Sequence, residues 1–133
     1  MKEQVARVFE LQRAHAPELA QRDAAARVAR LVALREAIVA RRDALAEAVQ
    51  QDFRKSAAEF ELTELHPVFE EIDHVTRSLA RWMKPRRVST PLLLAGTRSS
   101  VRPEPRGVVL ILSPWNYPFN LLVMPLIAAV AAG

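Results

Sequence analysis

A single asparagine held between two prolines is the residue of this sequence best suited to chemistry. It stands in the segment Pro114-Trp115-Asn116-Tyr117-Pro118, which lies between two apolar runs. Each proline fixes its own backbone angle and restricts the residue before it, so the segment predicts a stiff turn. An amide fixed in such a turn can donate a hydrogen bond to an oxyanion that forms only during a reaction. Asn116 is therefore the candidate catalytic residue.

A structural role for the same asparagine is the alternative. Asparagine side chains in turns often hydrogen-bond to their own backbone, and Asn116 would then only hold the turn closed. From the residue type and the turn alone, both interpretations stand.

The runs on either side of this turn predict a strand and a helix. Val108 to Leu112 is short, unbroken and apolar, which is typical of a strand buried on both faces. Leu121 to Ala132 continues as an apolar helix that contains Pro125 and stops at Gly133. A strand-turn-helix is where α/β proteins hold ligands. Because such a strand needs neighbours and helices on both faces, we expect this chain to be the N-terminal piece of a larger α/β protein.

The first two thirds of the sequence predict helices. A first helix is expected to end before Pro17, and a second, capped by Asp23, to run to residue 53 with a break at 41–43. A third is predicted from about 57 to 82, with a kink or restart near His66 caused by Pro67. The apolar residues at helical spacing that define the second and third helices are Val28, Leu31, Val32, Ile38, Leu45, Val49, Leu65, Val68, Phe69, Ile72, Val75, Leu79 and Trp82.

Residues 84–106 contain four prolines and predict a loop with short strands. The β-prone runs lie at 92–94 and 98–102, with a hairpin turn at 95–97 between them.

Composition excludes several kinds of site. The chain of 133 residues has no cysteine, which excludes a disulfide, a cysteine-type zinc site and a thiol nucleophile within it. The three histidines are scattered without metal-ligand spacing, so no metal site is predicted. The apolar C-terminal run is shorter than the about 20 residues that a membrane-spanning helix needs. With no signal-peptide core at the N-terminus, we expect a cytoplasmic protein.

The net charge of +4 does not by itself indicate a nucleic-acid partner. Acids and bases alternate at i,i+4 spacing along the predicted helices, as solvated helix faces do. A basic cluster at 81–87 lies beside Trp82 but lacks interleaved aromatic residues. Nucleic-acid binding is therefore only a third hypothesis.

The motifs together resemble the aldehyde dehydrogenase superfamily. The segment 107–133, with its Pro114-Trp115-Asn116-Tyr117-Pro118 turn, is similar to that family almost residue for residue. Tyr117 to Leu121, Asp52 to Lys55 and Phe69 to Ile72 resemble its class 3 branch of fatty and aromatic aldehyde dehydrogenases. His66-Pro67 and Trp82 to Val88 are similar to the bacterial coniferyl-aldehyde-dehydrogenase-like members.

The resemblance implies an α/β fold in three parts. These are a helical N-terminal segment (1–83), a proline-rich loop with short strands (84–106), and the first strand-turn-helix of a Rossmann-like cofactor domain, incomplete here (107–133). It implies oxidation of an aldehyde to a carboxylic acid with NAD or NADP. In the family a cysteine thiolate adds to the aldehyde, and a glutamate activates the water that later hydrolyses the thioester. Asn116 then matches the oxyanion-stabilising asparagine.

The resemblance also assigns the neighbours of Asn116. Pro114 and Trp115 match positions that border the nicotinamide, although the prolines could merely stiffen the turn and Trp115 could fill the core. Tyr117, Asn120 and Leu121 match positions that face the substrate tunnel, although Tyr117 could simply pack against its neighbours.

The chain departs from the family by what it lacks. The cysteine, the glutamate, the adenosine-binding lysine and the glycine turn for the pyrophosphate are all absent. We therefore expect the cofactor to bind only to the complete protein, which the resemblance implies is a homo-oligomer, with a dimer favoured, and the chain alone to be inactive. The alternative function is a non-catalytic helical module that docks a partner or a membrane surface through its apolar C-terminus.

Overall fold

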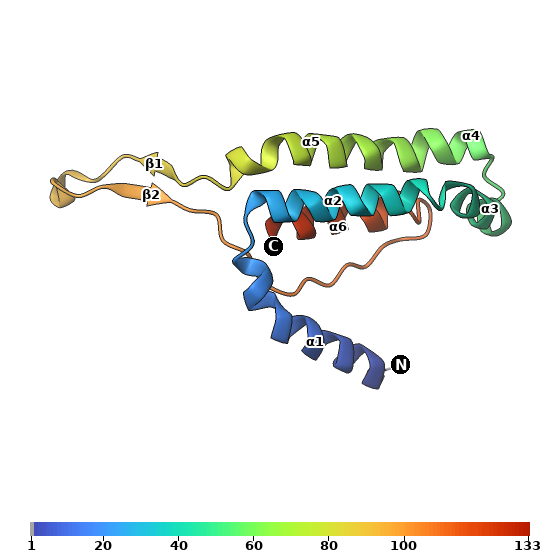
Figure 1. The fold of residues 1–133 in the computed structure, drawn as a ribbon, viewed down its shortest axis with the longest axis horizontal. Coiled ribbons are helices and arrows are strands. Elements are labelled where there is room, and N and C mark those ends of the chain that lie inside the picture. The colour runs from blue at the N-terminus through green and yellow to red at the C-terminus, as the bar shows by residue number, and fades with distance from the viewer. Residues whose placement is uncertain (1) are drawn as a thin grey trace.

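Three helices form the core of the computed structural model, which describes residues 2–133. They are α2 (Ala24–Val39), α5 (His66–Trp82) and α6 (Asn120–Ala132), and each packs against the other two. Figure 1 shows the three lying side by side, although α6 comes from the far end of the chain. The buried apolar residues of the core, which include three from the segments between α2 and α5, are Leu31, Ile38, Val49, Phe60, Leu65, Val68, Ile72, Val75, Leu79, Val123, Ile127 and Ala131.

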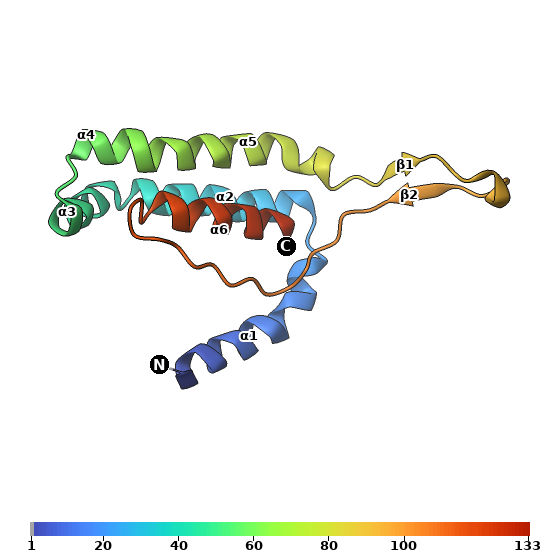
Figure 2. The same ribbon diagram turned by 180° about the vertical axis from the view of Figure 1, so that it is seen from behind.

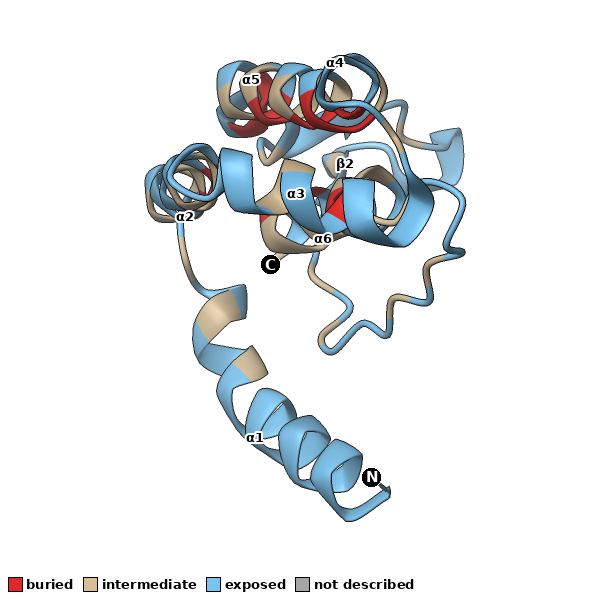
Figure 3. Ribbon diagram, turned by 90° about the vertical axis from the view of Figure 1, so that its right-hand side faces the viewer, coloured by how far each residue is buried: buried red, intermediate tan, exposed pale blue. Residues whose placement is uncertain are grey.

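The first helix, α1 (Lys2–Ala20), stands away from this core and buries none of its residues. Figure 3 shows it almost wholly exposed. The prediction that this helix ends before Pro17 was wrong, because the helix continues through that proline. A proline removes one helical hydrogen bond, here the one to the Arg13 carbonyl. Since this part of the helix is exposed, water can satisfy that carbonyl instead.

The start of α2 and the break after it were both predicted correctly. The Asp23 side chain accepts a hydrogen bond from the backbone N–H of Ala26 at 2.8 Å and so caps the helix. The helix ends at Val39, and α3 (Arg42–Phe53) follows directly.

Replacing the cap tests its contribution. Asp23→Ala is expected to lower the free energy of unfolding by about 1 kcal/mol, because one N–H at the helix start loses its acceptor. Urea titrations of parent and variant measure this difference. The matched control is Asp52→Ala, since Asp52 is an exposed acid that forms no side-chain hydrogen bond within residues 2–133. Equal destabilisation by both changes would contradict the capping role.

The predicted restart near His66 is confirmed. The third helical stretch consists of α4 (Ala57–Phe60), a π-helical turn, η1 (Glu61–Leu65), and then α5. Pro67 lies in the first turn of α5, where a missing N–H is tolerated. The π-helical turn thus absorbs the disturbance that the proline causes.

A two-stranded hairpin extends from the C-terminal end of α5, away from the core (Figure 1). Strand β1 (Arg86–Val88) pairs antiparallel with β2 (Ser99–Val101), with Val88 opposite Ser99. The hairpin and its second strand were predicted, but the first strand was placed wrongly at 92–94. Those residues form a short 3-10 turn, η2 (Leu92–Leu94), within the loop of the hairpin. A β-prone run forms a strand only where a partner strand lies opposite.

The segment 102–119 leads from the hairpin back along the core to α6 (Figure 2). The prediction of a strand at Val108 to Leu112 was wrong for this chain: these residues are not in a sheet, and Leu110 and Leu112 are 79% and 84% exposed. Within residues 2–133 no other strand lies beside them, and backbone groups without a partner strand form no ladder.

The C-terminal helix was predicted correctly. It runs from Asn120 to Ala132 with Pro125 inside it, and Gly133 follows with a φ of +87°. The glycine N–H donates to the carbonyl of Ala129, which is the usual way for a glycine to end a helix.

Candidate functional site

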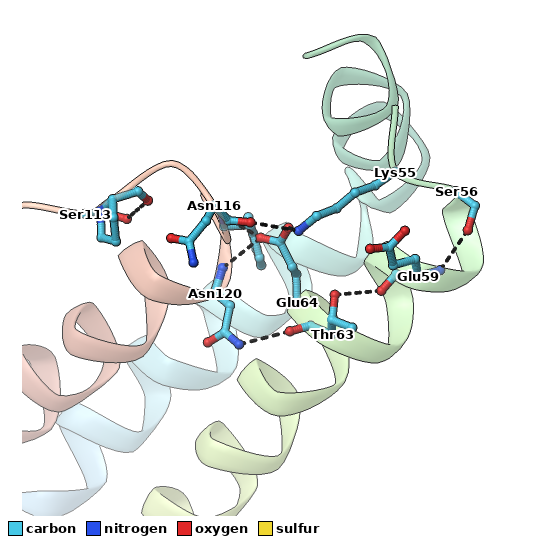
Figure 4. A network of polar contacts seen from close by, with 10 residues as sticks. Lys55, Ser56, Glu59, Thr63, Glu64, Ser113, Asn116 and Asn120 are labelled. Carbon is cyan, nitrogen blue, oxygen red and sulfur yellow. Dashed lines mark hydrogen bonds and ion pairs between the residues drawn. The ribbon is translucent and has the colours of Figure 1, made fainter. Parts of the chain in front are cut away.

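A fully buried carboxylate lies next to the Asn116 turn. Glu64 belongs to η1 and is 0% exposed. Its Oε1 lies 2.6 Å from the Nζ of Lys55, and its Oε2 accepts hydrogen bonds from the backbone N–H groups of Phe119 at 2.8 Å and Asn120 at 3.2 Å. Figure 4 shows these contacts converging on one side chain. Both carboxylate oxygens therefore have partners, as burial of a charge requires.

Glu64 supplies the cap that α6 lacks. The residue before this helix is Phe119, which has no side-chain oxygen to accept from the first N–H groups. Those groups would otherwise stay unsatisfied, and they also carry the positive end of the helix dipole. A carboxylate from η1 satisfies two of them and matches their charge. The start of α6 is thus fixed to another helix.

Lys55 connects this carboxylate to the turn. Its side chain is only 11% exposed. Besides Glu64, the Nζ donates to the backbone carbonyl of Asn116 at 3.1 Å and lies 4.1 Å from the centre of the Tyr117 ring. The residue before it, Arg54, ends α3 in the left-handed conformation with a φ of 59°. The chain reverses there and brings Lys55 back over the turn.

The side chain of Asn116 is not used by this network. The residue is exposed, and no hydrogen bond of its side-chain amide occurs within residues 2–133. In Figure 4 its backbone carbonyl points to Lys55 while its amide points away. The bond to its own backbone that the structural alternative requires is therefore not formed. The backbone is fixed and the amide remains available to a further group.

Asn120, by contrast, has a structural contact. Its Nδ2 donates to the carbonyl of Thr63 at 3.0 Å. In a regular helix that carbonyl would accept from the residue four positions later, which is Pro67 and has no N–H. The proline that interrupts the third helical stretch therefore frees an acceptor for the helix that carries Asn120.

The remaining predicted site residues lie along the same turn. Pro114 is exposed and Trp115 is 80% exposed, so this tryptophan does not fill the core of the described residues. Tyr117 lies beside Lys55 and is partly exposed, as is Leu121 in the first turn of α6. The six predicted residues are neighbours in the sequence, and of them Asn120 alone donates a side-chain hydrogen bond within residues 2–133.

Sequence reasoning missed Glu64 and the role of Lys55. Two signals point to the glutamate. It lies four residues after Phe60 and four before Val68, both buried, so the helical spacing puts a charge on the apolar face. The residue before the last helix is also a phenylalanine, which has no side-chain oxygen to cap it. A charged acid on a buried helix face needs a hydrogen-bond partner, and a helix start without a capping residue needs an acceptor. Together the two features predict that the acid caps the helix.

The opposite end of α6 is held by a buried cation. Arg27 of α2 is 5% exposed, and its guanidinium donates to the carbonyls of Ala131 at 2.9 Å and Ala20 at 3.2 Å. A Cβ added at Gly133 would lie 2.6 Å from this group. A cation at the carbonyl end complements the helix dipole as Glu64 does at the other end.

Other kinds of site find little support in residues 2–133. No group of three or more potential metal ligands occurs there, and none of the helices in that range is long and apolar enough to cross a membrane. An open hollow of about 900 Å³ is lined by the junction between α1 and α2, by parts of α5 and α6 and by residues 102–105, but not by the Asn116 turn.

Comparisons with known proteins agree on one family. The family model described as "Aldehyde dehydrogenase family" matches residues 1–133. Aldehyde dehydrogenase family 3 member B1 of Rattus norvegicus is 42% identical over 112 residues, which is 84% of this chain and 24% of the relative. The 4,4'-diaponeurosporen-aldehyde dehydrogenase of Staphylococcus aureus is 38% identical over the same shares of the two chains.

A solved structure shows the same fold. The substrate-bound state of Staphylococcus aureus AldH superposes with a TM-score of 0.91 at 35% identity, covering 97% of this chain and 28% of that one. The chain thus spans about a quarter of the length of the relatives that it matches. Its helices and hairpin are the N-terminal part of an α/β aldehyde dehydrogenase fold, as the resemblance implied. The chain belongs to the aldehyde dehydrogenase family, and its relatives include members of family 3.

Proposed function

We propose that this chain is the N-terminal part of an NAD(P)-dependent aldehyde dehydrogenase, and that Asn116 stabilises the oxyanion of the reaction. The observation that carries the proposal is the contrast between the backbone carbonyl and the side-chain amide of Asn116. Lys55 fixes the Asn116 carbonyl, while the Asn116 side-chain amide has no partner in the described residues. A donor that has no partner of its own and is carried on a fixed backbone is available to an oxyanion that forms beside it.

The chemistry explains why a neutral amide suits this position. When a nucleophile adds to an aldehyde, negative charge develops on the aldehyde oxygen. A fixed N–H donor stabilises that charge without having to reorganise during the reaction. Being uncharged, the amide exchanges no proton with the nucleophile. This chain has no cysteine, so the nucleophile comes from polypeptide outside these 133 residues.

The residues present fit one part of a nicotinamide cofactor and not another. Pro114 and Trp115 expose a flat, apolar surface beside Asn116, which suits a nicotinamide ring. The N-terminus of α6 does not suit the pyrophosphate, because Glu64 already accepts from its N–H groups. When bound, the cofactor would accept the hydride of the aldehyde. We propose that Pro114 and Trp115 border it, and that its phosphates are bound by the remainder of the protein.

The substrate side of the turn is assigned in the same way. We propose that Tyr117 and Leu121, both partly exposed, border the aldehyde. Asn120 contributes its backbone position, because its amide is engaged by Thr63.

Production of NAD(P)H tests this function. The complete protein is expected to reduce NAD or NADP when given aliphatic and aromatic aldehydes, and to release the corresponding carboxylic acids. The isolated 133-residue chain is expected to produce none, since it lacks the cysteine. For each protein, the absorbance of the reduced nicotinamide measures the NAD(P)H produced, and chromatography measures the carboxylic acid released. A complete protein that binds a partner but oxidises no aldehyde would favour the docking module instead.

A further inference from the structure

We propose that Lys55 and Glu64 form a positioning pair that sets the location of the Asn116 amide, and through it the rate of the reaction. This inference rests on the function proposed above and adds two residues to it. Neither touches the reacting atoms. Both act through the backbone of the turn.

The contacts of the pair enclose the turn from two directions. Lys55 holds the carbonyl of Asn116, and Glu64 holds the N–H groups of Phe119 and Asn120 three and four residues later. Because the ammonium and the carboxylate are themselves 2.6 Å apart, the two attachments are joined. The short piece of chain between them is therefore tied at both ends to a single ion pair (Figure 4).

Burial distinguishes this pair from the other ion pairs of the chain. The Glu64 side chain is fully buried and Lys55 nearly so, whereas the pair formed by Arg42 of α3 and Glu61 of η1 is considerably exposed. Burial of two charges has a large desolvation cost, so such a pair is weak support for a gain in stability. Here its hydrogen bonds end on the backbone of the turn that carries Asn116, which indicates that its effect is on position.

Position affects the rate strongly. A displacement of about 1 Å at a reacting group can cost about 100-fold in rate. If Glu64 loses its charge, Lys55 has no anion to hold it over the Asn116 carbonyl, and the backbone that carries the amide is no longer fixed in place. If the amide itself is absent, its position no longer matters. The effects of the two changes should therefore not multiply.

A double-mutant cycle in the complete protein tests the proposal. Glu64→Gln is expected to lower kcat by about 10- to 100-fold, because the amide is misplaced. In an Asn116→Ala background the same change should lower kcat by less than about three-fold. The KM for the cofactor and the melting temperature are measured for every variant. Glu61→Gln is the matched control: it removes the exposed partner of Arg42 and should leave kcat within about two-fold.

Substitutions of Lys55, the other member of the pair, give a second test of the proposal. Lys55→Met removes the hydrogen bond to the Asn116 carbonyl but leaves Glu64 bonded to the start of α6. It should lower kcat as Glu64→Gln does, and Lys55→Arg, which keeps the positive charge, should restore most of the rate. This test decides the question if Glu64→Gln does not fold.

Three results separate the inference from the function on which it rests. If Asn116→Ala lowers kcat but Glu64→Gln and Lys55→Met leave it unchanged, the positioning pair is refuted and the function stands. Losses that multiply in the double mutants would also refute it, because the pair would then act elsewhere. If Asn116→Ala itself has no effect on kcat, the proposed function of Asn116 is refuted, whatever the substitutions of the pair do.

Discussion

Asn116→Ala in the complete protein is expected to lower kcat by about 10²- to 10³-fold, which is the usual cost of removing one oxyanion donor. The alanine keeps the backbone carbonyl that Lys55 holds, so the turn retains its attachment. Only the amide is lost. Because that amide acts when charge develops on the aldehyde oxygen, kcat should fall more than the affinity for the cofactor.

Steady-state kinetics with saturating cofactor measure this loss. The matched control is Ser113→Ala, in the same segment, since within residues 2–133 the Ser113 hydroxyl bonds only to the adjacent Pro114 carbonyl. That variant should stay within a few-fold of the parent. If Asn116→Ala also stayed within a few-fold, Asn116 would have no part in the chemistry.

Phe60→Ala is expected to lower the free energy of unfolding by about 3–5 kcal/mol, as substitutions of buried phenylalanines do. Phe60 is 1% exposed and lies at the end of α4, directly before the π-helical turn. Its ring meets that of Phe119 edge to face, with 5.9 Å between centres. The cavity left by the change would therefore lie between the helix that carries Glu64 and the start of α6.

Urea titrations followed by circular dichroism measure the loss. Leu62→Ala serves as control because Leu62, two residues further along the same stretch, is largely exposed. Its loss should stay within about 0.5 kcal/mol, the range for surface changes. A comparable loss of unfolding free energy in both variants would mean that the buried Phe60–Phe119 contact contributes no more to stability than an exposed side chain does.

The local features of the fold could be read from the sequence because their causes are local. Asp23 is followed by a helix and caps it, and Pro67 disturbs a helix where it stands. The end of the C-terminal helix is likewise set locally, because a glycine with positive φ follows it. In each case the residue and its consequence are only a few positions apart.

The errors concern interactions that local pattern does not contain. Val108 to Leu112 has the composition of a buried strand but no strand beside it within residues 2–133, so it is exposed coil. Leu92 to Leu94 is β-prone yet lies in the loop of a hairpin whose register puts the strands elsewhere. The pairing partner decides whether such a run becomes a strand.

The sequence identified only part of the candidate site, again because some of its contacts join residues that are far apart in the chain. The Asn116 turn is a continuous segment and could be recognised by its prolines. Lys55 and Glu64 are far from it in sequence and reach it only through the packing of η1 against α6. Residue type and spacing identify Asn116 as the candidate, whereas tertiary contacts determine what holds the backbone of its turn.

The central claim is that the Asn116 amide stabilises the charge formed on the aldehyde oxygen. Rapid mixing of the complete protein with one equivalent of aldehyde and saturating NAD or NADP follows the first turnover alone. We predict that Asn116→Ala slows the first appearance of NAD(P)H by about 100-fold or more, with the dissociation constant of the cofactor unchanged. A first turnover of the Asn116→Ala variant at the parent rate would contradict it.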